Sequence, residues 1–467
     1  MNLNLPVHSY NLPPASTARL VNCYAEQLPA GAKTPVQLKR APGIKPWFES
    51  AGFGEIKAMY TKPISFKYGS RRDYLWVVNG SNVHFITKSL GNALVGTVGR
   101  TTGRVDIVSN TDSLVFVVEP RAYYYDGQTF GEITDENFVS RGSGDVEFID
   151  DFLLHREPNS SRFFAADLGT TNEFYALNLG IADHAPDELN GMIAEQGQAI
   201  LFGNESTEIW ENIGSSGFPF ARTANGTIEV GCHNAETVDR TFNIVFWVAD
   251  DLTVRRLDGL APTRVSTHAI EQKLREETIL SAFTYEMEGH FFYALSTSEG
   301  TYVYDVVTQE WHERQSYLNA NWIPRSSAVF DGKVLVGDPT QGRIGELDPD
   351  TYMDWNGTQR MEWTYQPVWA EGQRAFHDRL EIVLETGVGN TLPPGDDPKI
   401  MLSKSDDGGK TWQALPDKTF GKRGERLSRA VWHNLGSARQ RVYRAAVSDP
   451  VPVTVTSTLI EVRGGRL

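Results

Sequence analysis

Seven strand-turn-strand units recur along most of this chain, and their spacing restricts the fold more than any other feature. Each unit has an apolar run, a polar turn and a second run that often ends in aromatic residues and aspartate. The starts are 39, 38, 48, 44, 47 and 43 residues apart, about the length of one propeller blade. They begin at Leu75 (LWVVNGSNVHFI), Leu114 (LVFVVEPRAYYYD), Phe152 (FLLHREPNSSRFFAAD), Ile200 (ILFGNESTEIWEN), Ile244 (IVFWVADDLTVRRLDG), Phe291 (FFYALSTSEGTYVYD) and Val334 (VLVGDPTQGRIGELD).

Physical chemistry favours a ring of such units. A small sheet with two apolar faces cannot bury both alone, whereas a ring of sheets covers both faces of each. Helical periodicity is nearly absent; the exception is "VSTHAIEQKLREE", where Thr267 can cap a short helix with Ile270 and Leu274 on one face. We therefore expect an all-β protein, with a β-propeller of six or seven blades over residues 51–352 and one short helix docked on its side.

The pattern changes after Asp350. Residues 387–397 form a loop rich in glycine and proline, and short strands separated by turns follow it. This pattern is typical of a β-sandwich, expected over residues 353–467. The predicted strands lie near residues 361–367, 380–384, 399–403, 411–415, 428–433, 441–447 and 453–462.

The first 50 residues contain many prolines and glycines among few strand-like runs. We interpret residues 1–50 as an extended N-terminal arm that lies on another surface.

Composition excludes several classes of protein. The chain has 467 residues with 44 basic and 59 acidic side chains, a net charge of −15, which disfavours nonspecific binding to nucleic acid. Two cysteines without a C-x-x-C pair indicate neither a disulfide framework nor a zinc cluster, and the ten histidines show no metal-binding spacing. The sequence encodes no recognisable export signal and no apolar run long enough to span a membrane.

The segment "SDDGGKTW" at residues 405–412 invites two enzyme interpretations. A P-loop is excluded because Lys404 stands where its first glycine belongs, and Pro416 stops any following helix. The segment instead resembles the Asp-box of sialidases and other propeller proteins, a hairpin turn away from the catalytic centre. The residues predicted to form this structural turn are Ser405, Asp407, Gly409, Thr411 and Trp412.

We expect no catalytic, metal-binding or cofactor-binding residues and hence no enzyme. The acidic pairs at residues 250–251, 396–397 and 406–407 stand in turns, where aspartate bonds the local backbone. Two alternatives stay open: a sialidase-like propeller glycosidase, and a module, such as a lectin, that binds a glycan or receptor.

Several segments resemble the packaged-DNA stabilisation or tail nozzle (tail hub) proteins of short-tailed bacteriophages. The opening "ARLVNCYAEQLP" contains an Asn-x-Tyr-x-Glu motif and is followed by "RAPGIKPW"; "IEVGCHNAETV", "APTRVSTHAIEQKL" and "YVYDVVTQEWHER" are also similar. From these motifs and from aromatic loop residues, the candidate assembly contacts are Asn22, Tyr24, Glu26, Pro42, Gly43, Phe218, Phe220 and Trp322.

The resemblance implies a structural protein of the virion tail, assembled in the host cytoplasm. A homo-hexamer would sit beneath the ring of head-to-tail adaptor subunits, extend the DNA exit channel and retain packaged DNA until ejection. Its partners would be the adaptor, a tailspike or fibre, and a tail needle or plug, with double-stranded DNA passing through without sequence-specific binding. The arm interpretation adds that a chain lacking residues 1–47 should fold as a monomer but fail to join the tail.

Overall fold

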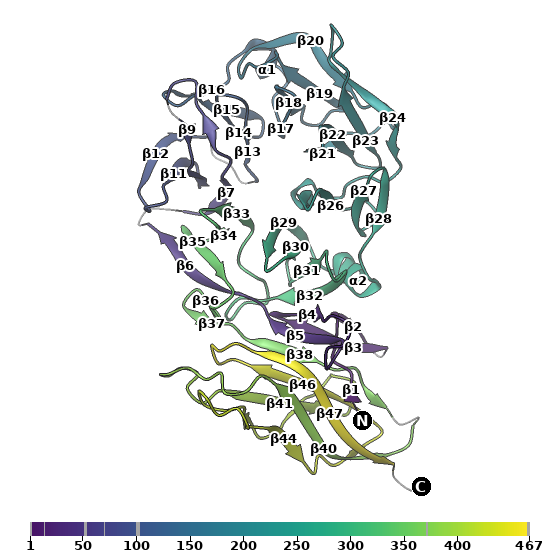
Figure 1. The fold of residues 1–467 in the computed structure, drawn as a ribbon. Helices are drawn as coiled ribbons and strands as arrows, with labels where there is room; N and C mark the ends of the chain where they lie inside the picture. The colour runs from purple at the N-terminus through teal and green to yellow at the C-terminus, as the bar shows by residue number, and fades with distance from the viewer. Residues whose placement is uncertain are drawn as a thin grey trace.

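The chain folds into a β-propeller and a β-sandwich, shown by a computed structural model that describes residues 2–13, 15–50, 54–69, 71–99, 103–369 and 372–464 (Figure 1). In the described part, seven four-stranded antiparallel units form the propeller. This agrees with the expected all-β class and is compatible with the six or seven blades expected. The two small strands β8 (Ile64–Ser65) and β9 (Arg71–Arg72) pair beside blade one.

Each predicted hairpin is the middle pair of strands of one blade. These pairs are β10 (Leu75–Asn79) and β11 (Asn82–Ile86), β14 (Leu114–Val118) and β15 (Arg121–Tyr125), β18 (Phe152–Arg156) and β19 (Arg162–Ala166), β22 (Gln198–Gly203) and β23 (Thr207–Asn212), β26 (Ile244–Val248) and β27 (Val254–Asp258), β30 (His290–Thr297) and β31 (Thr301–Asp305), and β34 (Lys333–Gly337) and β35 (Arg343–Asp348). Their apolar side chains are buried on both faces between neighbouring blades.

An inner and an outer strand complete each blade. The inner strands are β7 (Ile56–Tyr60), β13 (Asp106–Ser109), β17 (Val146–Ile149), β21 (Leu189–Glu195), β25 (Asp239–Thr241), β29 (Ile279–Met287) and β33 (Ser326–Phe330). The outer strands are β12 (Asn92–Thr97), β16 (Phe130–Glu132), β20 (Phe174–Ile181), β24 (Phe220–Ile228), β28 (Ala261–Arg264), β32 (Glu310–Arg314) and β6 (Gly43–Glu49).

The helix predicted after Thr267 is confirmed as α2 (His268–Glu276). The Thr267 hydroxyl accepts a bond from the N–H of Ile270, and Ile270 and Leu274 pack into the core between blades five and six. The other helical turns are α1 (Glu136–Val139) and the 3₁₀ turn η1 (Ala235–Thr237).

The C-terminal region is confirmed as a β-sandwich, and its two sheets share one core. One sheet has the order β4 (Cys23–Gln27), β5 (Val36–Arg40), β47 (Thr454–Gly464), β40 (Ala375–Leu384) and β44 (Ala430–His433), with β1 (Asn2–Leu3) and β45 (Ser437–Ala438) at its sides. The other contains β3 (Ser16–Val21), β38 (Met361–Thr364), β46 (Gln440–Val447), β41 (Lys399–Ser405) and β42 (Gln413–Ala414), with β2 (Tyr10–Leu12), β39 (Val368–Trp369) and β43 (Lys418–Thr419). The hairpin β36 (Met353–Asp354) and β37 (Gly357–Thr358) links the two domains, beside β6.

The N-terminal region corrects the prediction of an extended arm. Strand β6 closes blade seven by pairing with β35, while β3, β4 and β5 are integral strands of the sandwich. Strand β3 also pairs in parallel with β32 of blade six, so one sheet continues from the propeller into the sandwich. The prolines that suggested an arm stand mainly between these strands and interrupt the local pattern.

Candidate assembly site

Residues 16–49, called the strap below, carry most of the predicted assembly contacts and join the two domains of the subunit. The strap comprises β3 to β6. Its side chains Leu20, Leu38 and Ile44 are at most 1% exposed, so the segment is interior to the fold.

Asn22 forms the corner between β3 and β4. Its φ is 52°, a left-handed conformation that asparagine tolerates better than most residues. Its side-chain amide donates to the carbonyls of Gln315 (3.1 Å) and Arg360 (2.9 Å), and its side-chain oxygen accepts from the N–H of Gln315 (3.1 Å). Asn22 therefore holds the ends of blade six and of the domain link together.

Tyr24 and Glu26 follow on β4. Tyr24 is 3% exposed, packs edge-on against His290 and Phe292, and donates its hydroxyl to Glu288 (3.1 Å). Burial and the Glu288 carboxylate raise the pKa of Tyr24, so its phenol stays protonated. Glu26, half-buried, accepts a bond from the side chain of Gln37 on β5 (2.6 Å).

Arg40, which sequence reasoning did not single out, anchors the strap in the link between the domains. It is 3% exposed, and its guanidinium donates to the side chain of Gln359 and to the carbonyls of Asp449 and Val451. Because carbonyls replace a carboxylate partner, burial lowers the pKa of Arg40 to about 10. A buried arginine bonded to several segments fixes their geometry.

Pro42 and Gly43 turn the chain from the sandwich into blade seven. The Pro42 carbonyl accepts from Arg314 (2.9 Å) and from the side chain of Gln359 (3.0 Å). Gly43 lies in close contact with β36 of the hairpin that links the domains, since a Cβ at this position would lie 2.3 Å from the Met353 carbonyl oxygen. Only glycine fits this crossing.

These positions correct the prediction of assembly contacts. Asn22, Tyr24, Pro42 and Gly43 are buried against the same chain, and so are Phe220 (3% exposed) and Trp322 (1%). Phe218 lies against Phe163, Phe220 against Phe152, and Trp322 against Phe283 and the Arg314 guanidinium. Of the predicted set, only Glu26 and Phe218 are partly exposed.

The Asp-box-like turn has the predicted hydrogen bonds. Asp407 accepts from the backbone N–H of Lys410 and Thr411 and from the Thr411 hydroxyl (2.6 Å), and the Ser405 hydroxyl joins Asp407 to the N–H of Gly409. These donors hold the pKa of Asp407 below its usual value. Trp412 is half-buried beside the turn, under the guanidinium of Arg444. The segment is a closed structural turn of the sandwich.

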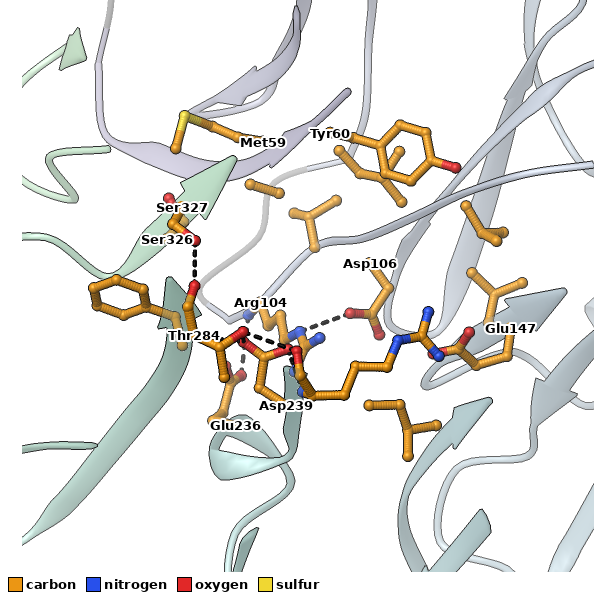
Figure 2. A pocket seen from close by; sticks show the side chains of 18 of the residues that line it. Met59, Tyr60, Arg104, Asp106, Glu147, Glu236, Asp239, Thr284, Ser326 and Ser327 are labelled. Carbon is orange, nitrogen blue, oxygen red and sulfur yellow. Dashed lines mark hydrogen bonds and ion pairs between the residues drawn. The ribbon is translucent and has the colours of Figure 1, made fainter. Parts of the chain in front are cut away.

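The inner strands surround a cavity of about 930 Å³ at the centre of the propeller. Charged side chains of both signs line it (Figure 2), among them Arg104, Asp106, Glu147, Glu236 and Asp239. Arg104 pairs with Asp106 (2.7 Å), and its backbone N–H donates to Glu236 (3.2 Å). Arg104 precedes blade two and Glu236 precedes blade five, so these contacts cross the channel.

Burial in the channel raises the pKa of three carboxyl groups. Burial raises the pKa of Asp106 to about 7, although Arg104 acts in the opposite direction. Burial likewise raises the pKa of Glu147 and Asp239, and Asp239 accepts from the backbone N–H of Thr284 (2.8 Å). The sequence pattern did not indicate this cluster, because Asp106, Glu147 and Asp239 lie on three separate short inner strands that are far apart in the chain.

This cluster predicts a pH-dependent stability. Asp106 is protonated in the folded protein below about pH 7 but ionised in the unfolded chain, so its contribution to stability falls as pH rises through 7. Between pH 6 and pH 8, Asp106→Asn should gain about 1 kcal/mol of unfolding free energy relative to the wild type. Denaturant unfolding of both proteins at the two pH values measures this difference. If the difference in unfolding free energy between the two proteins is the same at both pH values, the prediction is wrong.

A sialidase-like site would need several arginines that converge on a substrate carboxylate, but three arginines near blade turns, Arg264, Arg325 and Arg343, are each held by different partners. Arg264 pairs with Glu271, Arg343 with Asp338, and Arg325 donates to main-chain carbonyls near Trp322. Within the described residues, no cluster of three or more His, Cys, Asp or Glu side chains has a geometry for a metal ion. Among those residues, too, none of the helices is sufficiently long and apolar to cross a bilayer.

Two family models match the sequence in the order of the two domains. Residues 16–352 match the model described as the β-propeller of bacteriophage P22 Gp10, and residues 361–463 match its β-sandwich. The chain belongs to the bacteriophage P22 Gp10 family. As a Gp10-like protein it is a structural component of the tail of a short-tailed phage, of the packaged-DNA stabilisation kind. The start of the propeller match at Ser16 coincides with the start of the strap.

Two kinds of solved structure resemble this Gp10-like chain at low sequence identity. The extracellular domain of a putative one-component system from B. thetaiotaomicron is 11% identical with a TM-score of 0.45, and covers 87% of this chain. The chain spans 58% of that domain's length. A computationally designed protein, Ika8, is 12% identical with a TM-score of 0.41, covering 71% of this chain and 99% of its own. A comparison with curated proteins gives no match.

Proposed function

We propose that six copies of this chain assemble as a ring beneath the head-to-tail adaptor of the virion. The ring extends the DNA exit channel, retains the packaged DNA, and contacts the tailspike or fibre and the needle or plug. It assembles in the host cytoplasm and works without catalysis. The family match over both domains is the observation that carries this proposal.

The geometry of the propeller supports one part of the proposal, namely that the DNA path lies between subunits. The centre of the propeller is crossed by contacts between Arg104 and the segment at Glu236 and Val238. A duplex cannot pass such a channel. A DNA conduit built from this protein therefore needs a ring of several copies, with the propellers around the axis.

Charge supports free passage of DNA. Residues 51–352 contain 43 acidic and 23 basic side chains, and six copies carry six times the net charge of −15. Acidic surfaces that face the lumen would repel phosphates within about 8 to 10 Å of the wall. A strongly basic lumen in a map of the ring would contradict this part of the proposal.

Cryo-electron microscopy of virions tests the assembly. Six copies should encircle the tail axis directly below the adaptor. Particles produced without this protein should fill with DNA and then lose it, and supplying the protein in trans should restore retention. A different copy number, a position away from the axis, or full retention without the protein would contradict the proposal.

A further inference from the structure

The charge of the subunit is divided between its two ends. Residues 106–228, which form blades two to four, contain 21 acidic and 5 basic side chains. Residues 418–429 of the sandwich contain five basic side chains and one acidic. Strand β20 of blade three lies at one end of the molecule, and β44, which follows residue 429 directly, lies at the other (Figure 1).

The basic end is a pair of joined loops, residues 386–395 and 418–429, called the basic tip below. The Thr386 hydroxyl donates to the Arg426 carbonyl (2.8 Å), and the Gly424 N–H donates to the Gly387 carbonyl (3.0 Å). Exposed leucines stand on both loops: Leu392 is 73% exposed and Leu427 is 94% exposed.

Most charges of the basic tip have no acidic partner in the subunit. Within the described residues, Lys418, Lys422, Arg423 and Arg426 make no ion pair, whereas Arg429 is bound by Glu381. Cationic side chains beside two exposed leucines suit a protein surface that is both acidic and apolar. DNA phosphates alone would give the leucines no partner.

Such a surface exists on the same chain, at the outer edge of blade three. This acidic edge comprises α1, residues 167–173 and β20. In the described part of the chain no further strand pairs with the outer side of β20, although the Asn137 and Arg141 side chains donate to the Phe174 and Ala176 carbonyls. Four apolar side chains of the acidic edge are exposed: Val139 (61%), Leu168 (58%), Tyr175 (56%) and Leu177 (89%).

The charges of the acidic edge complement those of the basic tip. Glu136 on α1 and Glu173 just before β20 are exposed and form no ion pair among the described residues. An edge strand that no further strand covers, with exposed apolar side chains, is a common site of protein association. Opposite charge and exposed apolar groups thus occur together on two distant surfaces of one subunit.

We propose that the basic tip of one subunit docks on the acidic edge of blade three of the next copy. The inference rests on the ring proposed above and assigns its contact surfaces. Because the two surfaces differ and lie at opposite ends, the contact is head-to-tail, which is the type that closes into a ring when the rotation fits. Apolar contact supplies affinity, and charge selects the partner surface.

Charge reversal on the full-length chain tests this docking. Lys422→Glu with Arg426→Glu reverses the tip, and Glu136→Lys with Glu173→Lys reverses the edge; each variant alone should associate at least about ten-fold more weakly than the wild type. An equimolar mixture of the two variants should associate again, because every contact in an alternating ring then joins opposite charges. The four-fold variant should also associate with itself.

Sedimentation velocity and chemical cross-linking measure association, and thermal melting by circular dichroism establishes that each variant is folded. Lys399→Glu with Lys410→Glu changes the net charge equally outside the tip and should leave association unchanged. If a ring forms and neither reversal weakens it, the docking inference is wrong while the proposed function stands. If virions contain no ring, the proposed function itself fails.

Binding to a DNA oligonucleotide duplex tests the alternative that the basic tip contacts DNA. If the wild type binds the duplex, and the Lys422→Glu, Arg426→Glu variant loses that binding but keeps its association, the tip is a DNA-binding surface and the docking inference is overturned.

Discussion

Deletion of residues 1–49 is expected to abolish folding of the whole chain. The truncation removes the outer strand of blade seven and the five sandwich strands β1 to β5. Burial of Leu20, Leu38, Ile44 and Phe48 alone contributes about 6 to 12 kcal/mol, at about 1.5 to 3 kcal/mol for each side chain. Because whole domains are stable by only about 5 to 15 kcal/mol, this loss is decisive.

Circular dichroism and thermal melting measure the effect. A chain lacking only residues 1–4, which removes β1 from the edge of β47, is the matched control and should keep a cooperative melting transition. A cooperatively folded monomer after removal of residues 1–49 would restore the interpretation of this region as an arm and contradict the structure.

Gly43→Ala is expected to destabilise the protein by about 3 kcal/mol or more. The added Cβ would lie 2.3 Å from the Met353 carbonyl oxygen and 2.4 Å from that of Thr351, and both are main-chain atoms that no rotamer change can remove. The chain would have to separate β6 from the link between the domains, where the Gly43 N–H now donates to the Thr351 carbonyl (2.7 Å).

Urea unfolding of Gly43→Ala beside Gly54→Ala provides the comparison. A Cβ at Gly54 would meet only the Asn79 side-chain oxygen, at 3.6 Å, so this control should change the unfolding free energy by less than about 1 kcal/mol. Equal effects of the two substitutions would show that the crossing at Gly43 is not tight.

The middle hairpins of the blades, the helix after Thr267 and the Asp-box-like turn were predictable, since each depends on neighbours in sequence. Apolar runs such as Leu75–Asn79 are buried on both faces, and Asp407 bonds residues within four positions. The strap was not predictable in the same way. Leu20 pairs with Trp363, and Gly43 with Asp348, so their partners lie more than 300 residues away.

The predicted assembly contacts show a second limit of prediction from sequence. A motif indicates that a position requires a certain residue type. It does not indicate whether that residue makes its contacts within the subunit or with another subunit. Asn22 serves a left-handed corner, and Trp322 a stack with Arg314, both within one chain. The exposure of Leu427 and Leu177 could be recognised only in the structure, because leucine is usually buried and nothing in the sequence marks these two as exposed.

The distant pairing of the strap has a consequence for synthesis of the protein. The strands that are synthesised first pair with segments that are synthesised much later. Strand β6 pairs with residues 343–348, β3 with residues 361–364, and β1 with residues 458–459. At about 5 to 20 residues per second, translation of the roughly 300 residues between β6 and its partner takes about 15 to 60 s. Strands β1 and β5 wait longer still, for β47. The propeller can therefore close while the last strands of the sandwich are still being made, whereas the sandwich closes only when β47 is available to β1 and β5.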